Sequence, residues 1–410
     1  MSWLAEQAAL TGARWSAGAT WGTSEWVDPD DVPEYEPDEA IRVGVFVAGI
    51  DVTAKTRSAS WSVGQSDVLS EGIQVGSAAL TLQEYAGGFD SAGFAYEGFE
   101  PIDDSISPAI GSRVVVATDW DVLWVGTTEG STLSEAAGQQ PSVSVRAVDD
   151  LARANQDVTD EPSGGYLFPA LDQLLAKAGI SGSSWTRAPG DQSNPYDFVN
   201  SIGTSLGDDA YELTNKLYSG SIISLLGAFA YHCCMGAAWT PYGLRVGVLH
   251  LQTDTYNGWL SNVWHQVYAS DVEHQVDRVY NDWTVSDSIN TWTHVDTASV
   301  DAYGRRAITV DGSAYRTAKA SDLEDQWWTC IYGRDRDMSE QAWPRYSEPF
   351  YTRTLRARIN SKRHRLTRAL PFDNLYVDDF ELWRVLSVSH DVSVDGWNVT
   401  LDTVRTISNV

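Results

Sequence analysis

Apolar and polar residues alternate within one segment near the N-terminus, Ser58–Asp90, and this pattern constrains the fold more than any other feature. The segment predicts a strand, a polar turn and a second strand, followed by a turn at Gly87-Gly88. The two sides of the second strand are expected to be Ala78, Leu80 and Leu82 on one face and Ala79, Thr81 and Gln83 on the other. A sheet with one buried face is therefore expected here.

Residues 41–149 contain several more short strand patterns. Ile41–Ile50 begins the series, Arg113–Thr118 and Val122–Thr127 flank a polar turn, and Ser142–Ala147 ends it. Short strands at such spacing are typical of a small barrel or sandwich. We therefore predict a first β domain over this region.

Residues 150–275 combine helix and strand patterns. Pro169–Ala178 predicts a helix, with proline in its first turn and Gly179 just past its end. Ser221–Trp239 is long and apolar enough to resemble a membrane span, but His232 and two glycines interrupt it. Its apolar stripe at helical spacing favours a buried helix followed by a hairpin, so we predict an α/β domain and no membrane span.

The composition is strongly acidic, with a formal net charge of −28 over 410 residues. Nonspecific binding to nucleic acid depends on Lys and Arg that neutralise phosphates, so this charge argues against it. An acidic conduit would let DNA pass without holding it, and solubility alone explains the charge equally well. The hydrophobic fraction of 43% is sufficient for a buried core.

Two groups of residues are candidates for contacts between subunits. Tryptophans recur in an acidic arm at residues 1–40, where they either latch onto a neighbouring subunit or fold back on their own domain. A basic run with no acid in it either docks on an acidic neighbour, contacts DNA or forms a solvated face with local ion pairs. The candidates are Trp3, Trp15, Trp21 and Trp26 in the arm and Arg353, Arg356, Arg358, Lys362, Arg363, Arg365 and Arg368 in the run.

Patterns for catalysis or cofactor binding are weak. The sequence has no H-E-x-x-H zinc motif and no phosphate-binding G-x-x-x-x-G-K-[ST] loop. Ser205 lies in a G-x-S-x-G string inside a Gly- and Ser-rich loop, and His390 and Asp391 point to opposite faces of an expected strand. Paired acids such as Asp149-Asp150 are neighbours in sequence and so give no evidence of a glycosidase carboxylate pair. Asp208 and Asp209 either bind a cation from their loop or, as we expect, are solvated. We predict no catalytic, metal or cofactor site, and a protein that is not an enzyme.

The chain has three cysteines, Cys233, Cys234 and Cys330. Adjacent cysteines do not easily bridge each other, so reduced thiols are expected, as in a protein assembled in a cytoplasm. A disulfide from Cys330 to one of the adjacent pair is the alternative. The N-terminus lacks the basic region of a signal peptide.

Four motifs occur in order along Arg57–Val404. They consist of Ser60, Trp61, Ser62, Gly64, Ser66, Gly76, Ala78, Thr81, Leu82, Phe89 and Asp90; then Ser299, Tyr303, Gly304, Arg305 and Arg306; then Tyr346, Ser347, Glu348 and Pro349; then Ser389, His390, Val392, Gly396, Trp397 and Leu401. Together they resemble the motifs of tail-hub (minor tail) proteins of long-tailed phages, especially phages of actinobacteria.

This resemblance implies a structural virion protein at the tail tip, assembled in the host cytoplasm. The implied fold is a β-rich α+β chain with two tail-tube-like β-barrels joined by an α/β insert. The implied domains are an extended arm at 1–40, a first barrel at 41–149, a middle domain at 150–275, and a second barrel at 276–410 with a helical insertion near 320–345.

The resemblance also implies partners. Three copies would form a pseudo-hexameric ring that closes the tail tube and stacks on a ring of distal tail protein. Tail-tip or fibre proteins would bind the other side, the C-terminus of the tape-measure protein would reach the lumen, and DNA would pass without specific binding. The alternative is a carbohydrate-binding minor tail protein that contacts the host surface, since aromatic side chains stack on sugars. An enzyme that cuts the cell wall is a third candidate.

Overall fold

The computed structural model describes the chain in segments from residue 43 to residue 407. The described residues are 43–65, 67, 69–83, 99–102, 105–118, 121–134, 142–180, 211–232, 234–248, 258–260, 267–275, 278–287, 289–312, 315–317, 324, 327–328, 330–332, 345–359, 366, 369–377, 381–393 and 396–407. The predicted arm at 1–40 lies outside them.

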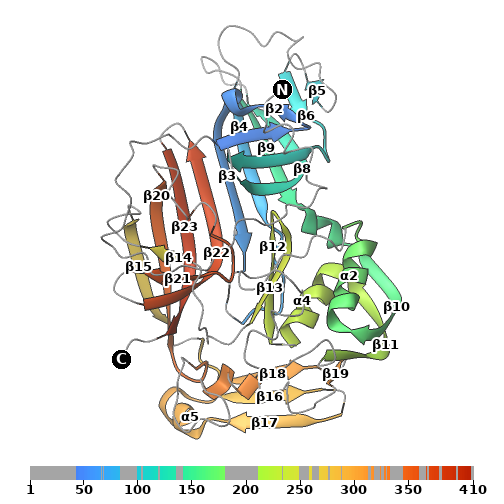
Figure 1. The fold of residues 1–410 in the computed structure, drawn as a ribbon, viewed down its shortest axis with the longest axis vertical. Coiled ribbons are helices and arrows are strands. Elements are labelled where there is room, and N and C mark those ends of the chain that lie inside the picture. The colour runs from blue at the N-terminus through green and yellow to red at the C-terminus, as the bar shows by residue number, and fades with distance from the viewer. Residues whose placement is uncertain are drawn as a thin grey trace.

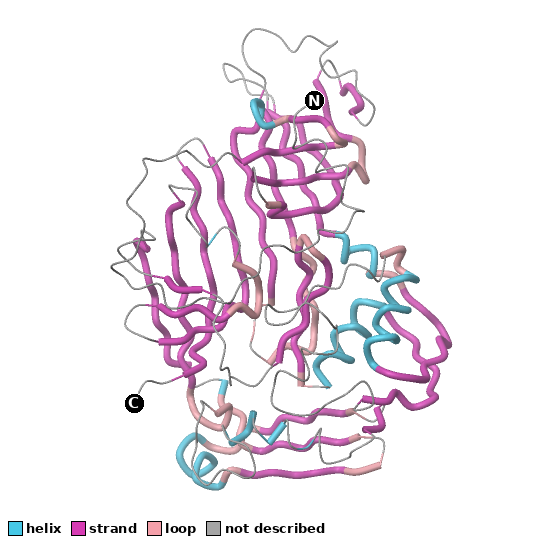
Figure 2. Tube along the Cα trace, in the orientation of Figure 1, coloured by secondary structure: helices cyan, strands magenta, loops and turns pink. Residues whose placement is uncertain are grey.

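Strands dominate the described part of the chain (Figure 2), as expected for a β-rich fold. The largest sheet has 13 strands and contains both early and late parts of the chain. Its main path runs through β15 (Val267–Gln275), β20 (Phe350–Ile359), β23 (Gly396–Ile407), β22 (Glu381–Ser393), β3 (Thr56–Gly64), β4 (Ser77–Gln83), β9 (Ser142–Asp149), β8 (Val122–Ser134), β7 (Arg113–Thr118), β1 (Val43–Val47) and β2 (Ile50–Asp51). Off this path, β21 (Asn374–Val377) pairs with β22 and with β14 (Gly258–Leu260).

The predicted alternation is confirmed on β4. Ala78, Leu80 and Leu82 are buried, while the residues between them are exposed or half-buried. Strand β7 has the predicted bounds, whereas β8 and β9 extend beyond theirs. Residues 130–134 of β8 pair with the predicted part of β9, Val148 and Asp149 pair with the predicted part of β8, and the register shifts between Thr128 and Gly130. Local alternation therefore located these strands, and cross-strand pairing set their ends.

The first and last parts of the chain meet at the antiparallel pair β3–β22. In Figure 1 the blue β3 lies beside the red β22, between the upper strands and the C-terminal strands. Buried side chains from both sides of this pair belong to one hydrophobic cluster, which includes Leu80, Val145, Val388 and Leu401. A continuous apolar core therefore lies under both parts of the sheet.

Three helical elements lie together on the right of the molecule in Figure 2. They are the 3-10 turn η4 (Asp150–Ala154), α2 (Leu167–Lys177) and α4 (Ile222–His232), beside a small sheet of β10 (Asp157–Tyr166), β11 (Tyr211–Ser221) and β19 (Tyr315–Thr317). The predicted buried helix is confirmed as α4, since Ile222, Leu226 and Phe229 are buried and the hairpin β12 (Met235–Thr240)–β13 (Gly243–Val248) follows. Within the described segments, no helix is long and apolar enough to cross a membrane.

The β12–β13 hairpin packs on the turn that precedes β21. Gly236 and Gly247 face each other across the hairpin, and both lie against the ring of Phe372. A Cβ atom at Gly247 would lie 2.6 Å from Cγ of Phe372, so only glycine leaves room for the ring. Beside it, the buried guanidinium of Arg245 donates to Asp373, with Nη2 2.8 Å from Oδ1. These contacts fix the middle of the chain on the C-terminal strands.

A second small sheet, at the bottom of Figure 1, contains β17 (Thr291–Val295), β16 (Asp282–Ser286) and β18 (Ala307–Asp311), with the short helix α5 (Thr297–Tyr303) at its end. The remaining elements are the 3-10 turn η2 (Thr53–Lys55) and the two-stranded pair β5 (Phe99–Ile102) and β6 (Ser105–Pro108). Isolated helical residues occur between 324 and 332, inside the predicted helical insertion.

Two segments of the C-terminal third, Val276–Val285 and Thr352–Ala369, also carry strand patterns, and β16 and β20 cover part of each. The strand expected over Val276–Val285 begins only at Asp282, because the backbone of Tyr280 instead donates to the Tyr346 carbonyl. Among the described residues of Thr352–Ala369, residues up to Ile359 belong to β20, and Leu366 is buried in a helical turn. At Tyr280, a tertiary contact and not strand pattern decides the local structure.

Candidate assembly surface

The pair β3–β22 brings two of the sequence motifs into contact. Its register places Trp61 opposite His390 and Ser62 opposite Ser389. Because side chains alternate along a strand, the aromatic pair points into the core and the serine pair points to the other face. The Ser-Trp-Ser and Ser-His motifs are therefore the two sides of one strand pairing.

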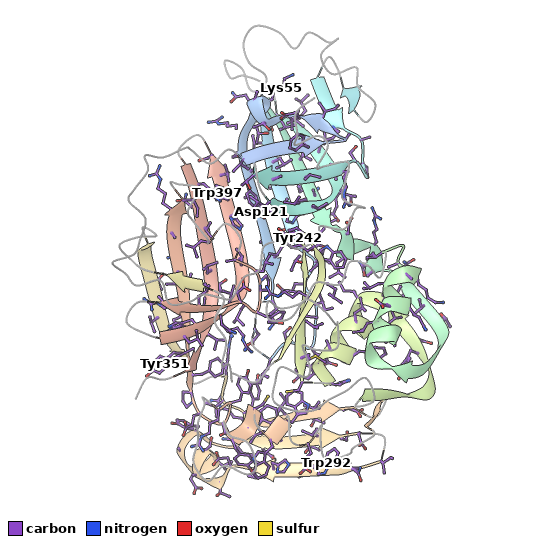
Figure 3. The ribbon with its side chains drawn as sticks, viewed as in Figure 1. Lys55, Asp121, Tyr242, Trp292, Tyr351 and Trp397 are labelled. Carbon is purple, nitrogen blue, oxygen red and sulfur yellow. The ribbon has the colours of Figure 1, made fainter. Side chains whose placement is uncertain are left out.

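Three rings from these motifs form a buried cluster at this pairing. The rings of Trp61 and His390 are stacked, with centroids 4.7 Å apart and planes 14° from parallel. Trp397 on β23 completes the cluster, and its indole Nε1–H donates to Nδ1 of His390 over 3.2 Å. Figure 3 shows Trp397 close to the border between the C-terminal strands and β3.

This environment keeps His390 neutral. Burial lowers the pKa of His390 to about 3, because a charged imidazolium would lose its hydration. The hydrogen bond from Trp397 needs an unprotonated Nδ1, so the proton of the neutral ring is on Nε2. Asp391 points to the opposite, exposed face of β22, as predicted, so the two neighbours do not form a catalytic dyad.

The opposite face of the same sheet carries small polar side chains, and we call it the hydroxyl face. It is defined by Ser58, Ser60, Ser62, Ser77, Thr81, Ser144, Thr354, Ser389 and Thr400. One row crosses five strands, since Arg356 lies opposite Thr400, which pairs with Ser389, then Ser62, then Ser77. The row continues across the boundary between the N-terminal and C-terminal parts of the chain.

Hydrogen bonds along the hydroxyl face are local. Thr354 Oγ1 donates to Oδ1 of Asp402 over 2.9 Å, and Ser387 Oγ donates to its Oδ2 over 2.7 Å. The hydroxyls of Ser62 and Ser77 lie 3.4 Å apart. The same face also carries charged residues of both signs, among them Arg146 opposite Ala79, Asp391 opposite Ser60 and Asp402 opposite Thr354, so its hydroxyls lie among local charges.

The main path of the sheet ends at β15 on one side and at β2 on the other. Strand β15 is bonded to β20 along one edge, and its exposed residues include Val272, whose side chain is 55% exposed between Asp271 and Glu273. An edge strand presents backbone groups that a strand of another chain can pair with. Both ends of the path are thus candidate contact sites between copies.

The predicted basic run does not form a single charged face in the described residues. Arg353 lies over the ring of Trp383, with its guanidinium carbon 5.5 Å from the ring centroid. Arg356 is on the opposite side of β20 and pairs with Asp271 of β15, with Nη1 2.7 Å from Oδ2. Arg358 is exposed on the Arg356 side. Lys362, Arg363, Arg365 and Arg368 lie outside the described residues, as do Trp3, Trp15, Trp21 and Trp26.

Asp149 and Asp150 have separate structural roles. The buried carboxylate of Asp149 accepts from the backbone N–H of Gly76 (2.5 Å) and of Leu151 (2.9 Å), which caps η4 and ties it to β4. Burial raises the pKa of Asp149 to about 8 despite these two donors. Asp150 instead pairs with Arg113. Ser205, Asp208 and Asp209 lie outside the described residues, within which no group of three or more His, Cys, Asp or Glu is placed to hold a metal ion.

The two middle motifs also meet. Ser299 in α5 donates its hydroxyl to the carbonyl of Ser347, and Ser347 Oγ lies 2.8 Å from Oδ2 of Asp296, the residue that caps α5. Asn281 holds the following segment, accepting from the backbone of Arg306 over 2.8 Å and donating to the Gly304 carbonyl over 2.8 Å. These motif residues therefore position the small sheet, and the sequence alone did not indicate that they are in contact.

Solved structures of tail proteins share this fold. The tail protein from Neisseria meningitidis MC58 aligns with a TM-score of 0.55 at 13% identity, covering 89% of this chain and 96% of that one. The fold is that of phage tail proteins. The 43 kDa tail protein of prophage MuSo2 from Shewanella oneidensis aligns with a TM-score of 0.54 at 12% identity, covering 90% of this chain and 97% of that one. No protein-family model matches the sequence, and no curated protein matches it.

Proposed function

We propose that this protein is a structural component of a phage tail and forms the hub at the tail tip. The support is that its fold spans nearly the whole of two tail proteins. The four sequence motifs also resemble those of tail-hub proteins, and their described residues hold the sheet and its attached units together.

The observation that carries the proposal is the continuous sheet through β3 and β22. It has an apolar core on one face, the hydroxyl face on the other, and at each end of its path a strand whose outer edge pairs with no other described strand. Two strand units in one chain, the predicted barrels at 41–149 and 276–410, would let three copies present six similar units around an axis. In this arrangement the ends of the sheet pair between neighbours and the hydroxyl face lines the lumen.

The proposed lumen explains the charge. A chain with a net charge of −28 repels DNA, and the carboxylates of Asp391 and Asp402 on the hydroxyl face would offset the arginines there. The ring would stack on a distal tail ring, bind tip or fibre proteins, contact the end of the tape-measure protein and let DNA pass. A carbohydrate-binding role is less well supported, since the exposed aromatic side chains in the described segments are Tyr242, Tyr303 and Tyr351 on separate elements. Figure 3 shows Tyr242 and Tyr351 well apart.

Native mass spectrometry of the purified full chain tests the proposal. We expect a species of three times the subunit mass, and the variant Val272→Lys should shift it toward monomer because it adds a cation to the exposed edge of β15. Thr291→Lys, at an exposed position on the small sheet, is the matched control and should leave the trimer intact. A monomer at all concentrations, with no position at the tail tip in imaged virions, would contradict a hub.

A further inference from the structure

Two cysteines from distant parts of the chain touch in the core. The sulfur of Cys234 lies 3.2 Å from the sulfur of Cys330, although 96 positions separate them in the sequence. Cys234 directly precedes β12 in the turn after α4, and Cys330 belongs to the helical residues 330–332. Both are fully buried within the same hydrophobic cluster.

The surrounding contacts hold the two sulfurs in place. The indole Nε1–H of Trp327 donates to the His232 carbonyl over 3.3 Å, and the rings of Trp327 and Tyr231 lie 5.4 Å apart. The backbone of Cys234 donates to the Tyr231 carbonyl, and the Cys330 carbonyl accepts from Tyr346. The end of α4 and the residue 327–332 segment are therefore fixed side by side on both flanks of the cysteines.

The backbone at Cys234 supports a specific role for its side chain. Its φ is +60°, in the left-handed region that disfavours residues with a Cβ atom. Glycine would satisfy this turn with less strain, yet a thiol occupies the position and contacts the second thiol. The contact between the two thiols is thus made from a backbone position that favours glycine.

We propose that Cys234 and Cys330 are a redox pair that forms a disulfide when the protein meets an oxidised thiol outside a reducing compartment. One thiolate attacks glutathione disulfide, whose S–S bond breaks and releases one glutathione thiol. The second cysteine then attacks this mixed disulfide, forms the Cys234–Cys330 bond and displaces the second glutathione. The two cysteines lose two hydrogens and two electrons, and glutathione disulfide gains them. The bond would tie the α4–β12 turn to the C-terminal third, and this inference holds whatever the protein's role in the tail.

Oxidation is expected to be slow in the folded protein. Burial raises the pKa of the Cys330 thiol well above its usual range, so little thiolate is present at neutral pH. The pair therefore stays reduced during assembly. During long exposure to oxidant, the disulfide forms when local opening of the fold exposes the thiols.

The test is the intact mass of the full chain after prolonged incubation with glutathione disulfide and then alkylation in denaturant. We expect a loss of about 2 Da in the wild type and in Cys233→Ser, with one free thiol left in the wild type and none in Cys233→Ser, whereas Cys234→Ser and Cys330→Ser keep both remaining thiols free. A cross-link that persists in Cys234→Ser would assign the bond to Cys233 and overturn the proposal, as would three free thiols in the wild type. Thermal unfolding of the wild type serves as a second readout that needs no variant. Oxidised protein should melt at a higher temperature than the same protein in reductant, and equal melting temperatures would also count against the pair.

Discussion

His390 lies flat against Trp61 across the strand pair β22–β3, with ring centroids 4.7 Å apart, at the place where the two ends of the chain join one sheet. Protonating His390 therefore changes the stability of the fold at this junction. The pKa of His390 is lowered from 6.5 to about 3 by burial, so the folded state favours the neutral ring. The stability that this gives is complete above the unfolded pKa and is lost as pH falls toward the folded pKa.

We expect the free energy of unfolding to fall by about 2 kcal/mol between about pH 6.5 and about pH 4.5 through this group, with a slope that approaches about 1.4 kcal/mol per pH unit. Urea unfolding across this range measures it. Asp149 acts with the opposite sign, since its pKa is raised and its contribution is lost as pH rises toward about 8. The pH profile of the wild type is therefore compared with that of His390→Gln. Glutamine is neutral throughout, so this variant should not lose unfolding free energy through position 390 as the pH falls. Parallel pH profiles for the two proteins would show that His390 stays uncoupled from folding.

Trp397→Phe tests the hydrogen bond at the same junction. The variant keeps a ring near His390 but loses the Nε1–H donor, which lies 3.2 Å from Nδ1. We expect a loss of about 1–3 kcal/mol in unfolding free energy, because a buried acceptor is left without its partner. The pKa of His390 should also rise, since the bond favours the neutral ring.

Trp124→Phe is the matched control for this change. Trp124 is also buried, and its Nε1 has no hydrogen-bond partner among the described residues, so only packing is lost. NMR titration of the His390 ring in both variants separates the effects. An unchanged His390 pKa in Trp397→Phe would mean that burial alone sets it.

How much of this site the sequence reveals depends on the range of the contacts. Alternation on β4 is local, and it was predicted with the correct residues. Trp61 and His390 were each noticed inside a motif, but more than 300 residues of sequence separate them. Nothing in periodicity indicates that β3 pairs with β22, because the register depends on the whole folded sheet.

Buried charge was the other feature that pattern could not reveal. In the sequence, Arg353 is one member of a basic run, and Arg245 is a basic residue after an apolar segment. In the structure, Arg245 is fully buried against Asp373, and Arg353 lies on Trp383. A sequence shows where a charge occurs, but its partner comes from another strand.

Gly247→Ala should weaken the docking of the β12–β13 hairpin. The added Cβ would lie 2.6 Å from Cγ of Phe372, and the ring cannot retreat freely because the Phe372 backbone donates to the Val385 carbonyl over 2.8 Å. We expect a loss of about 1–3 kcal/mol in unfolding free energy, as in other overpacked cores. Gly130→Ala in β8 is the control, because its Cβ would meet no atom closer than 3.8 Å. Equal midpoints of chemical unfolding for the two variants would exclude a packing role for Gly247.

Arg245→Met should destabilise the protein by about 3–5 kcal/mol, because it leaves the buried carboxylate of Asp373 without its cation. The double variant Arg245→Met, Asp373→Leu removes both charges and should recover most of this loss. Arg356→Met breaks the exposed pair with Asp271 and should cost less than about 1 kcal/mol. Chemical unfolding of the three variants measures these values. Additive effects in the double variant would show that Arg245 and Asp373 act independently.

Ser389→Arg tests the role proposed for the hydroxyl face. The residue is half-buried on that face, between Thr400 and Ser62, so an extended Arg side chain reaches solvent and should change unfolding free energy by about 0.5 kcal/mol or less. In the proposed ring, each of three copies would add one cation to the lumen. We therefore expect particles to assemble but to release DNA more slowly, and the delay to shrink as salt rises, because phosphate contacts weaken with salt. Dye-detected DNA release from purified particles measures this. Ser389→Gln adds length without charge, so a salt-independent delay in both variants would indicate a steric effect, and normal release by Ser389→Arg would place the hydroxyl face outside the lumen.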